Sequence, residues 1–454
     1  MKTIIYFIAV LWVILNSSCK KFVGVDVPIH KVVSSSVFLD DKTATSAILG
    51  LYSRMASTTG TFSDGATTLY LGVASDELKY LGSAAEINSF YTNVVGAGNS
   101  YVYDYYWADP YKIIYQANAC LEGLQASSKV TPSLHKQLMG EAYFVRAFCY
   151  WYLLNFFGDV PLNLTTNYEL NAVMARTSAV EVNSQIIDDL QKARAMLSKS
   201  YPTAGKLRPN YFTATALLSR VYLFNENWKA SEGTATEIIT SGLYSLEKDI
   251  NRCFLISSSE AIWQLAIPDV QIINTIEGNR FIPTNSAATL PNYEIMSGLL
   301  SAFETGDLRR TSWIGSKTVG GVTYNYPYKY KVRSSTGAKM EHCIIFRLAE
   351  LYLNRAEARV HLNNIEGASA DLNMIRDRAS LPSISVTGVS TILKEKRVEY
   401  FAEWGMRWFD LKRTGELDQI MSAAKTTWIS TAKLFPIPSA EIQVNPNLTQ
   451  NKGY

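Results

Sequence analysis

"SLHKQLMGEAYFVRAFCYWYLLNFF", residues 133–157, is the longest stretch of the chain with apolar side chains at helical spacing. Its aromatic residues lie on more than one face of the expected helix: Phe144, Phe148, Trp151, Tyr152 and Phe156. A helix that is apolar on most sides is buried in a protein core. Gly158 stands where a helix commonly ends. The stretch therefore predicts a long central helix whose rings pack against neighbours.

Helical periodicity continues on both sides of this stretch. Apolar residues recur every three or four positions over 44–55, 114–124 and 182–197. Ser178 and Glu181 form a capping-box pattern at the start of the third segment. Pro209 can begin a further helix that runs through residue 225.

Two segments, 216–239 and 351–375, share one layout. Each reads as a helix, a short turn with Asn, and a second helix with a small residue near its start (Ala230 and Ala368). This layout is typical of tetratricopeptide-type helical pairs. We therefore predict a mostly α fold, in which such hairpins form a scaffold and only a few short strands occur.

Between the helical blocks lie Gly-, Ser-, Thr- and Tyr-rich stretches near 57–106 and 245–340. Long irregular segments in a compact domain are usually functional, and loops on a rigid scaffold often carry binding residues. Within the second stretch, 321–332 alternates in places and predicts a strand or hairpin.

The N-terminus has the pattern of an export signal. Lys2 precedes an apolar run from Ile4 to Leu15, which is too short to span a membrane. The run ends at Cys19 without an Ala-x-Ala site. This pattern resembles a bacterial lipoprotein signal. We expect residues 1–18 to be removed, Cys19 to carry lipid, and 19–454 to form a single domain attached to a membrane without crossing it.

Composition excludes some function classes. The 454 residues carry a net charge of only +3, which gives no electrostatic sign of nucleic-acid binding. Four further cysteines are widely spaced, and we expect structural thiols rather than a redox site: Cys120, Cys149, Cys253 and Cys343. Their pairing cannot be read from sequence.

No catalytic or metal motif is present. The four histidines are isolated, and no H-E-x-x-H, G-x-S-x-G or phosphate-binding loop occurs. We expect no enzyme activity, no cofactor and no metal site. Asp76 and Glu77 favour a structural turn over sugar or cation contacts. A glycoside hydrolase whose two carboxylates are distant in sequence remains an alternative.

Four stretches carry a family resemblance. They are "EAYFVRAFCYWYLLNFFGDVPL" (141–162), "FRLAELYLNRAEA" (346–358), "EKRVEYFAEWGMRWFDLKRTG" (395–415) and "FPIPSAEIQVNPNLTQNKGY" (435–454). Together with Cys19 they resemble the SusD/RagB family over essentially the whole chain.

The resemblance implies an outer-membrane lipoprotein of Bacteroidetes that faces the cell exterior, although Lys20 and Lys21 replace the acidic residues often found in surface-export signals. It implies partnership with a SusC-like TonB-dependent barrel. It also implies capture of oligosaccharides for import, with peptides as the alternative ligand, and no catalysis.

Exposed aromatic rings flanked by amides suit sugars, because each ring joins an apolar face to a polar handle. The two Tyr-rich stretches supply the candidate ligand-binding residues: Tyr80, Asn88, Phe90, Tyr91, Asn93, Tyr293, Trp313 and Tyr324. We expect the two stretches to approach each other and share one ligand, and replacement of Trp313 by Ala to weaken capture without unfolding the chain.

One charged residue lies in the apolar run of the central helix. Arg146 needs a buried partner there, and Glu141 or Glu357 could supply it.

Overall fold

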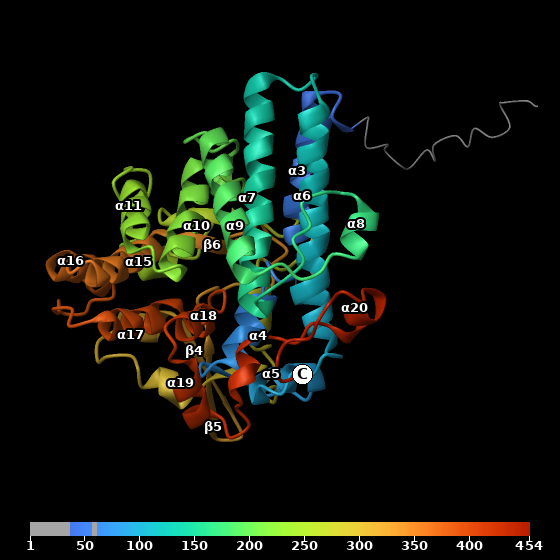
Figure 1. Ribbon diagram of the computed structural model, residues 1–454. Coiled ribbons are helices and arrows are strands. Elements are labelled where there is room, and N and C mark those ends of the chain that lie inside the picture. The colour runs from blue at the N-terminus through green and yellow to red at the C-terminus, as the bar shows by residue number, and fades with distance from the viewer. Residues whose placement is uncertain (1–36, 57–60) are drawn as a thin grey trace, which may run out of the picture.

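The computed structural model describes residues 37–56 and 61–454 (Figure 1). Cys19 and the predicted signal lie outside the described residues. Among the helices that the structure describes, none combines the length and the apolar character needed to cross a bilayer.

One half of the molecule is a row of packed helices (Figure 1). They are α3 (Asp41–Met55), α6 (Asp109–Ala126), α7 (Pro132–Phe157), α9 (Ala179–Met196), α10 (Tyr211–Phe224), α11 (Trp228–Ile239), α15 (Leu348–His361) and α16 (Ile365–Arg378). Neighbours in this row pack together, and α11 also packs against α15, which joins the two hairpins predicted from 216–239 and 351–375. The mostly α prediction with tetratricopeptide-like hairpins is confirmed.

Helix α7 lies in the middle of the core. Its side chains from Gln137 to Leu153 are all buried, and the helix ends at Gly158, whose φ of 73° favours glycine. Arg146 pairs with neither predicted partner. Its guanidinium donates two bonds of 2.7 Å to the buried carboxylate of Asp189 on α9, because α9 lies directly against α7.

Helix ends follow the sequence signals closely. Ser178 and Glu181 make the predicted capping box at the start of α9. Helix α10 begins two residues after Pro209, because Asn210 is its N-cap and accepts from the backbone of Thr213.

The other half is built from short elements. They are α4 (Ala66–Ala74), β1 (Leu78–Tyr80), α5 (Ala85–Thr92), the π-helix η2 (Val102–Ala108), η4 (Ile250–Arg252), β2 (Ala261–Leu265), α12 (Ile276–Phe281), β3 (Tyr293–Ile295), α13 (Ser297–Leu300), α14 (Leu308–Ser312), β4 (Ile314–Val319), β5 (Val322–Pro327) and β6 (Cys343–Arg347). The prediction of irregular segments at 57–106 and 245–340 therefore holds only in part, because elements this short give little periodic signal.

The strands form three two-stranded antiparallel sheets, β1–β3, β2–β6 and β4–β5. The predicted hairpin exists, but its first strand precedes 321–332. It turns at Gly320 and Gly321, which both have positive φ and join β4 to β5.

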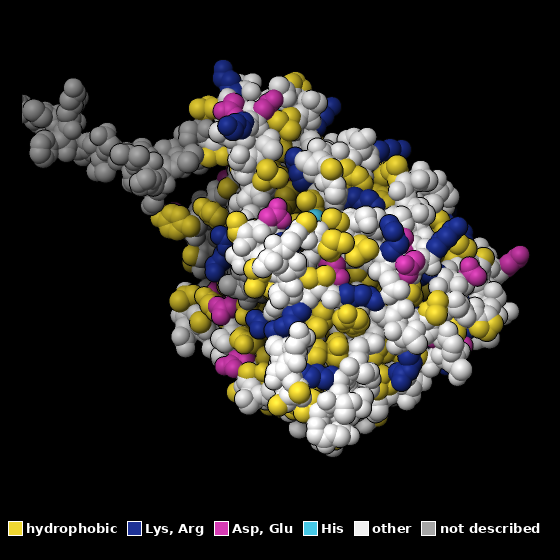
Figure 2. Space-filling view, turned by 180° about the vertical axis from the view of Figure 1, so that it is seen from behind, with side chains coloured by type: hydrophobic (Ala, Val, Ile, Leu, Met, Phe, Trp, Pro, Cys, Tyr) yellow, Lys and Arg dark blue, Asp and Glu magenta, His cyan; other side chains and the backbone are white. Residues whose placement is uncertain are grey.

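The chain closes with α17 (Val389–Tyr400), α18 (Met406–Arg413), α19 (Leu417–Ala424), η5 (Ser430–Lys433) and α20 (Ser439–Val444), while α8 (Tyr168–Ala172) and η3 (Ala204–Lys206) lie in connections of the helical half. The four cysteines predicted to be structural are buried free thiols. On the face shown in Figure 2, lysines and arginines alternate with hydrophobic side chains and form no single charged field.

Candidate functional site

A cavity of about 300 Å³ opens where the short elements meet the helical half. Its lining comes from α4, β1, α5, η2, α12 and β3: Ala66, Leu69, Tyr70, Tyr80, Ala84, Ile87, Tyr101, Tyr105, Ile276, Arg280, Asn292 and Tyr293. Five of these twelve residues are tyrosines, so phenol side chains make up a large part of its walls.

The β1–β3 ladder brings together two segments more than 200 residues apart in sequence. Tyr80 stands opposite Tyr293 in this ladder, and their ring centroids are 5.4 Å apart. The backbone of Leu81 extends the pairing by donating to the carbonyl of Asn292. The prediction that the two Tyr-rich stretches approach each other is therefore confirmed.

A second group of tyrosines forms the adjoining wall. Tyr70 on α4 lies 5.1 Å from Tyr101 and 6.0 Å from Tyr105, measured between ring centroids. Burial raises the pKa of Tyr70 and Tyr105, so both phenols are neutral at physiological pH. Neutral phenols can donate and accept hydrogen bonds, as a ring of sugar hydroxyls requires.

Tyr80 occupies its position because residue 82 is glycine. A Cβ placed on Gly82 would lie 2.2 Å from the Tyr80 hydroxyl. The exposed side chains of Arg280 and Asn292 stand at the rim of the cavity, where a guanidinium and an amide can bond to a polar ligand.

Comparison with known proteins gives one consistent result. Residues 56–223 match the SusD-like family described as "Starch-binding associating with outer membrane", and residues 303–454 match the SusD family. The chain belongs to the SusD/RagB-like family. SusD-like protein P25 of Formosa agariphila is 27% identical, over 77% of this chain and 79% of that protein. The starch-binding protein SusD of Bacteroides thetaiotaomicron is 32% identical over 24% of this chain and 21% of its own length.

Solved structures of SusD-like proteins share the fold over nearly the whole chain. A SusD superfamily protein from Bacteroides vulgatus superposes with a TM-score of 0.82 at 20% identity, covering 92% of this chain and all of that one. A laminarin-binding SusD-like protein gives a TM-score of 0.78 at 23% identity, covering 91% and 99%.

Of the eight predicted ligand residues of this SusD-like chain, only Tyr80 and Tyr293 line the cavity. Trp313 is fully buried, contrary to the prediction of an exposed platform. Its indole donates to the carbonyl of Ile250, and the ammonium of Lys329 lies 4.5 Å from its ring. Replacing Trp313 with Ala would leave a cavity in the core, so we now expect this substitution to destabilise the fold rather than to act on ligand capture alone.

Phe90 and Asn93 are also buried. Phe90 stacks under Tyr70, with ring centroids 5.5 Å apart, and supports the cavity wall from behind. Asn93 adopts a left-handed backbone at the end of α5, and its amide donates to the carbonyl of Ala74. Neither side chain is placed to contact a ligand.

The remaining three predicted residues are half-buried but lie away from the cavity lining. Asn88 and Tyr91 are on α5, and the Tyr91 ring lies 5.1 Å from the ammonium of Lys425. Tyr324 stands opposite Lys317 on the β4–β5 hairpin.

Sequence reasoning missed Tyr70, Tyr101, Tyr105, Arg280 and Asn292. The spacing of Tyr101 and Tyr105, four residues apart in a helical segment, was the one available signal for a shared face. Tyr70 lies in a nine-residue helix that is buried throughout, so nothing in its local pattern marks it as a cavity residue.

The adjacent carboxylates Asp76 and Glu77 have structural partners. Asp76 accepts from the guanidinium groups of Arg397 and Arg407 at 2.7 to 3.0 Å, which joins α17 and α18 to the end of α4. Glu77 accepts from the backbone of Ala402.

In the described part of the chain, one group could offer metal ligands: Asp64, Glu277 and Cys343. All three side chains are buried, and burial raises the pKa of both carboxyls. Protonation therefore removes most of the cost of burying them. No sequence pattern marks this group, because its members come from three separate segments.

Proposed function

We propose that this SusD-like chain is a lipid-anchored outer-membrane protein that captures oligosaccharides and delivers them to a TonB-dependent transporter. The observation that carries the proposal is the tyrosine-lined cavity, in which Tyr80 and Tyr293 meet through the β1–β3 ladder. Relatives described as starch-binding and laminarin-binding support carbohydrate as the ligand class.

The chemistry of the cavity favours binding over hydrolysis. Glycoside hydrolysis needs two carboxyl groups facing the bond that breaks. The described residues that line the cavity include no Asp and no Glu, and their polar groups are phenols, a guanidinium and an amide. These groups can hold a sugar but do not provide the pair of carboxyl groups that most glycoside hydrolases use. We infer a binding protein rather than an enzyme.

A binding experiment with residues 20–454 tests the ligand class. Laminarin, soluble starch and a mixed peptide library are titrated into the chain by calorimetry. Binding of a glycan supports the proposal, whereas binding of peptides alone would replace it with the peptide-binding alternative. Release of reducing ends from laminarin or starch would show an enzyme.

Matched variants assign the binding to the cavity. Tyr80→Ala should weaken glycan binding about fivefold, because one aromatic platform contributes roughly 1 kcal/mol beyond the area it buries. Tyr324→Ala removes a half-buried tyrosine that lies outside the cavity lining, so its affinity should stay unchanged. Equal effects of the two substitutions would exclude this cavity as the site.

Delivery to a transporter is tested on the full chain in its native membrane. Mild detergent extraction should co-purify the chain with a TonB-dependent barrel. Recovery of the chain alone, under conditions that leave other outer-membrane complexes intact, would contradict this part of the proposal.

A further inference from the structure

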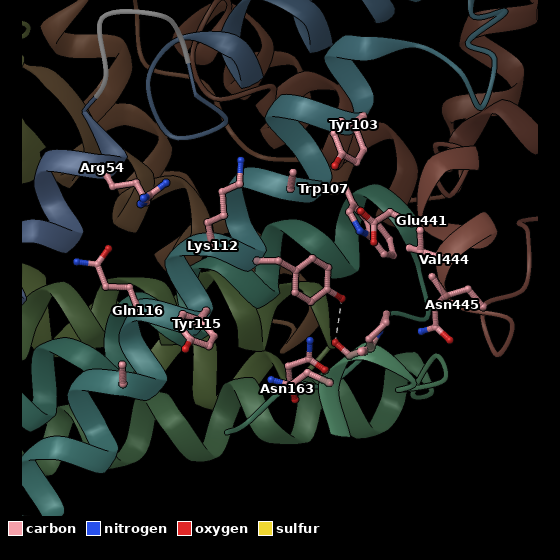
Figure 3. Close-up of a pocket in the computed structure, with 17 residues that line it drawn as sticks. Arg54, Tyr103, Trp107, Lys112, Tyr115, Gln116, Asn163, Glu441, Val444 and Asn445 are labelled. Carbon is pink, nitrogen blue, oxygen red and sulfur yellow. Dashed lines mark hydrogen bonds between the residues drawn. The ribbon is translucent and has the colours of Figure 1, made fainter. Parts of the chain in front are cut away.

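A second and larger hollow lies on another side of the same helical segment. It has a volume of about 710 Å³ and runs between α6, α8 and α20 (Figure 3). It shares no lining residue with the tyrosine-lined cavity. We call it the α6 groove.

A row of aromatic residues forms one wall of the α6 groove. Tyr103, Trp107, Tyr111 and Tyr115 follow each other at four-residue spacing along η2 and α6. The row extends roughly 18 Å along the helix. Tyr101 and Tyr105, from the same segment, face the other cavity. The π-helix η2 therefore presents rings to both hollows, and such segments are frequent at functional sites.

The rings in the groove are held in fixed orientations. Trp107 packs edge-on against Phe157 with ring centroids 5.0 Å apart, and its ring lies 5.2 Å from that of Tyr111. The Tyr111 hydroxyl donates to the carbonyl of Pro161 at 2.9 Å. Tyr115 is 52% exposed and offers a free ring face at one end of the row. Fixed rings lose little entropy when a ligand stacks on them.

The opposite wall carries amide oxygens that lack partners. The side-chain oxygens of Asn163 and Asn171 are buried and accept no hydrogen bond from the described residues. The Asn171 amide nitrogen donates to the carbonyl of Thr165 at 2.7 Å, which fixes the orientation of its oxygen. Most buried acceptors in proteins are paired, so two unpaired ones beside a hollow indicate a ligand or water that donates to them.

Charged and apolar groups complete the lining. Arg54 and Lys112 stand toward one end of the groove, and Glu441 and Val444 on α20 toward the other (Figure 3). Flat apolar faces beside hydrogen-bond acceptors and a few charges fit a carbohydrate, whose rings have apolar faces edged by donating hydroxyls. A purely apolar partner would leave the amide oxygens unpaired.

We propose that the α6 groove is a second carbohydrate site, in which the aromatic row carries sugar rings while Asn163 and Asn171 accept bonds from their hydroxyls. This inference rests on the proposed glycan-binding function. A chain with two separate sites can hold one long polysaccharide at two places, and this raises the apparent affinity for long chains over short ones.

The test uses residues 20–454 with laminarin and with a short oligosaccharide prepared from it. The double variant Tyr115→Ala/Asn171→Ala removes one ring and one acceptor from the groove. The control Tyr168→Ala removes a more exposed tyrosine, 74% accessible, on α8 outside the groove lining. A third variant, Tyr80→Ala, weakens the other cavity.

We expect calorimetry to give two equivalents of the oligosaccharide per wild-type chain and one per double variant. Laminarin affinity should fall at least fivefold in the double variant and stay unchanged in the control. A stoichiometry of one for the wild type, with affinity reduced in Tyr80→Ala and unchanged in the double variant, would overturn the second site alone. Absence of binding by the wild type to any glycan would overturn both proposals.

Discussion

At the scale of single residues, the position of Tyr80 depends on a neighbour without a side chain. Its hydroxyl lies where a Cβ of residue 82 would stand, so Gly82 decides the position of the Tyr80 ring. The backbone at Gly82 is not in the left-handed region, and an alanine there meets only the flexible end of Tyr80.

We therefore predict that Gly82→Ala displaces the Tyr80 ring without unfolding the chain. Glycan affinity should fall about as far as in Tyr80→Ala, roughly fivefold, with the melting temperature nearly unchanged. Calorimetric titration and a thermal melt measure the two effects. Gly98→Ala is the control, because a Cβ there meets nothing within 4 Å. Unchanged affinity in Gly82→Ala would show that Tyr80 tolerates other positions.

A second residue-scale prediction concerns pH. Burial, together with the nearby charge of Asp76, raises the pKa of Glu77 from 4.5 to about 7. The neutral carboxyl is therefore favoured in the folded state. Relative to an ionised carboxyl, the protonated Glu77 side chain stabilises the folded state by about 3 kcal/mol. This stabilisation is fully present below pH 4.5 and is lost as the pH rises through 7.

Glu77→Gln should remove this pH dependence. Urea denaturation at pH 5 and at pH 8 measures the free energy of unfolding of both proteins. Between these two pH values, the variant should become more stable relative to the wild type. Because all other titrating groups are shared, parallel curves for the two proteins would contradict the raised pKa.

At the scale of elements, one carboxylate ties several short segments to the helical scaffold. Glu399 on α17 pairs with Arg309 of α14 at 3.0 Å, and also with Arg347 and Arg378. Arg347 ends β6, and Arg378 ends α16. The three guanidinium groups hold the pKa of Glu399 well below its usual range. Elements too short to be stable alone are thus held together by buried charge.

Glu399→Gln should destabilise the chain by about 3–5 kcal/mol, because it leaves buried guanidinium groups without their shared anion. Chemical denaturation measures this loss. The exposed Glu366 on α16 gives the matched control, and Glu366→Gln should change stability by no more than about 0.5 kcal/mol. Similar effects of the two substitutions would show that the cluster contributes no more than a surface charge.

At the scale of the whole molecule, a row of helices supports a layer of short elements, and both hollows adjoin the segment where the two halves join. Helix α6 and the preceding η2 pack against α7; η2 lines both hollows, whereas α6 lines the α6 groove alone. A rigid support of this kind keeps aromatic platforms in place before a ligand arrives, which lowers the entropic cost of binding.

The anchor gives the prediction at this scale. Cys19→Ser should abolish incorporation of labelled palmitate, because it removes the thiol that we expect to carry lipid. Without this anchor, the chain should move from the membrane fraction to the soluble fraction. Cys149→Ser is a suitable control, since that thiol is buried in α7 and inaccessible to lipidation. Continued labelling of Cys19→Ser would contradict the lipoprotein signal.

The helical scaffold could be predicted from sequence alone. Periodicity and capping are local properties, and they placed α7, the capping box of α9 and both helical pairs within a few residues. The family resemblance could also be recognised from sequence, because the motifs that carry it are continuous stretches of chain.

Which aromatic rings form a site depends on the packing of segments that are distant in sequence. Trp313 and Tyr80 come from stretches of similar composition, yet Trp313 is enclosed by Phe254 and Lys329, whereas Tyr80 faces a cavity with Tyr293. The partner of Arg146 was likewise decided by the packing of α9 against α7. An aromatic ring can pack in a protein core or stack on a sugar equally well. Whether the ring is exposed depends on packing partners that are distant in sequence, and a local sequence pattern does not predict those partners.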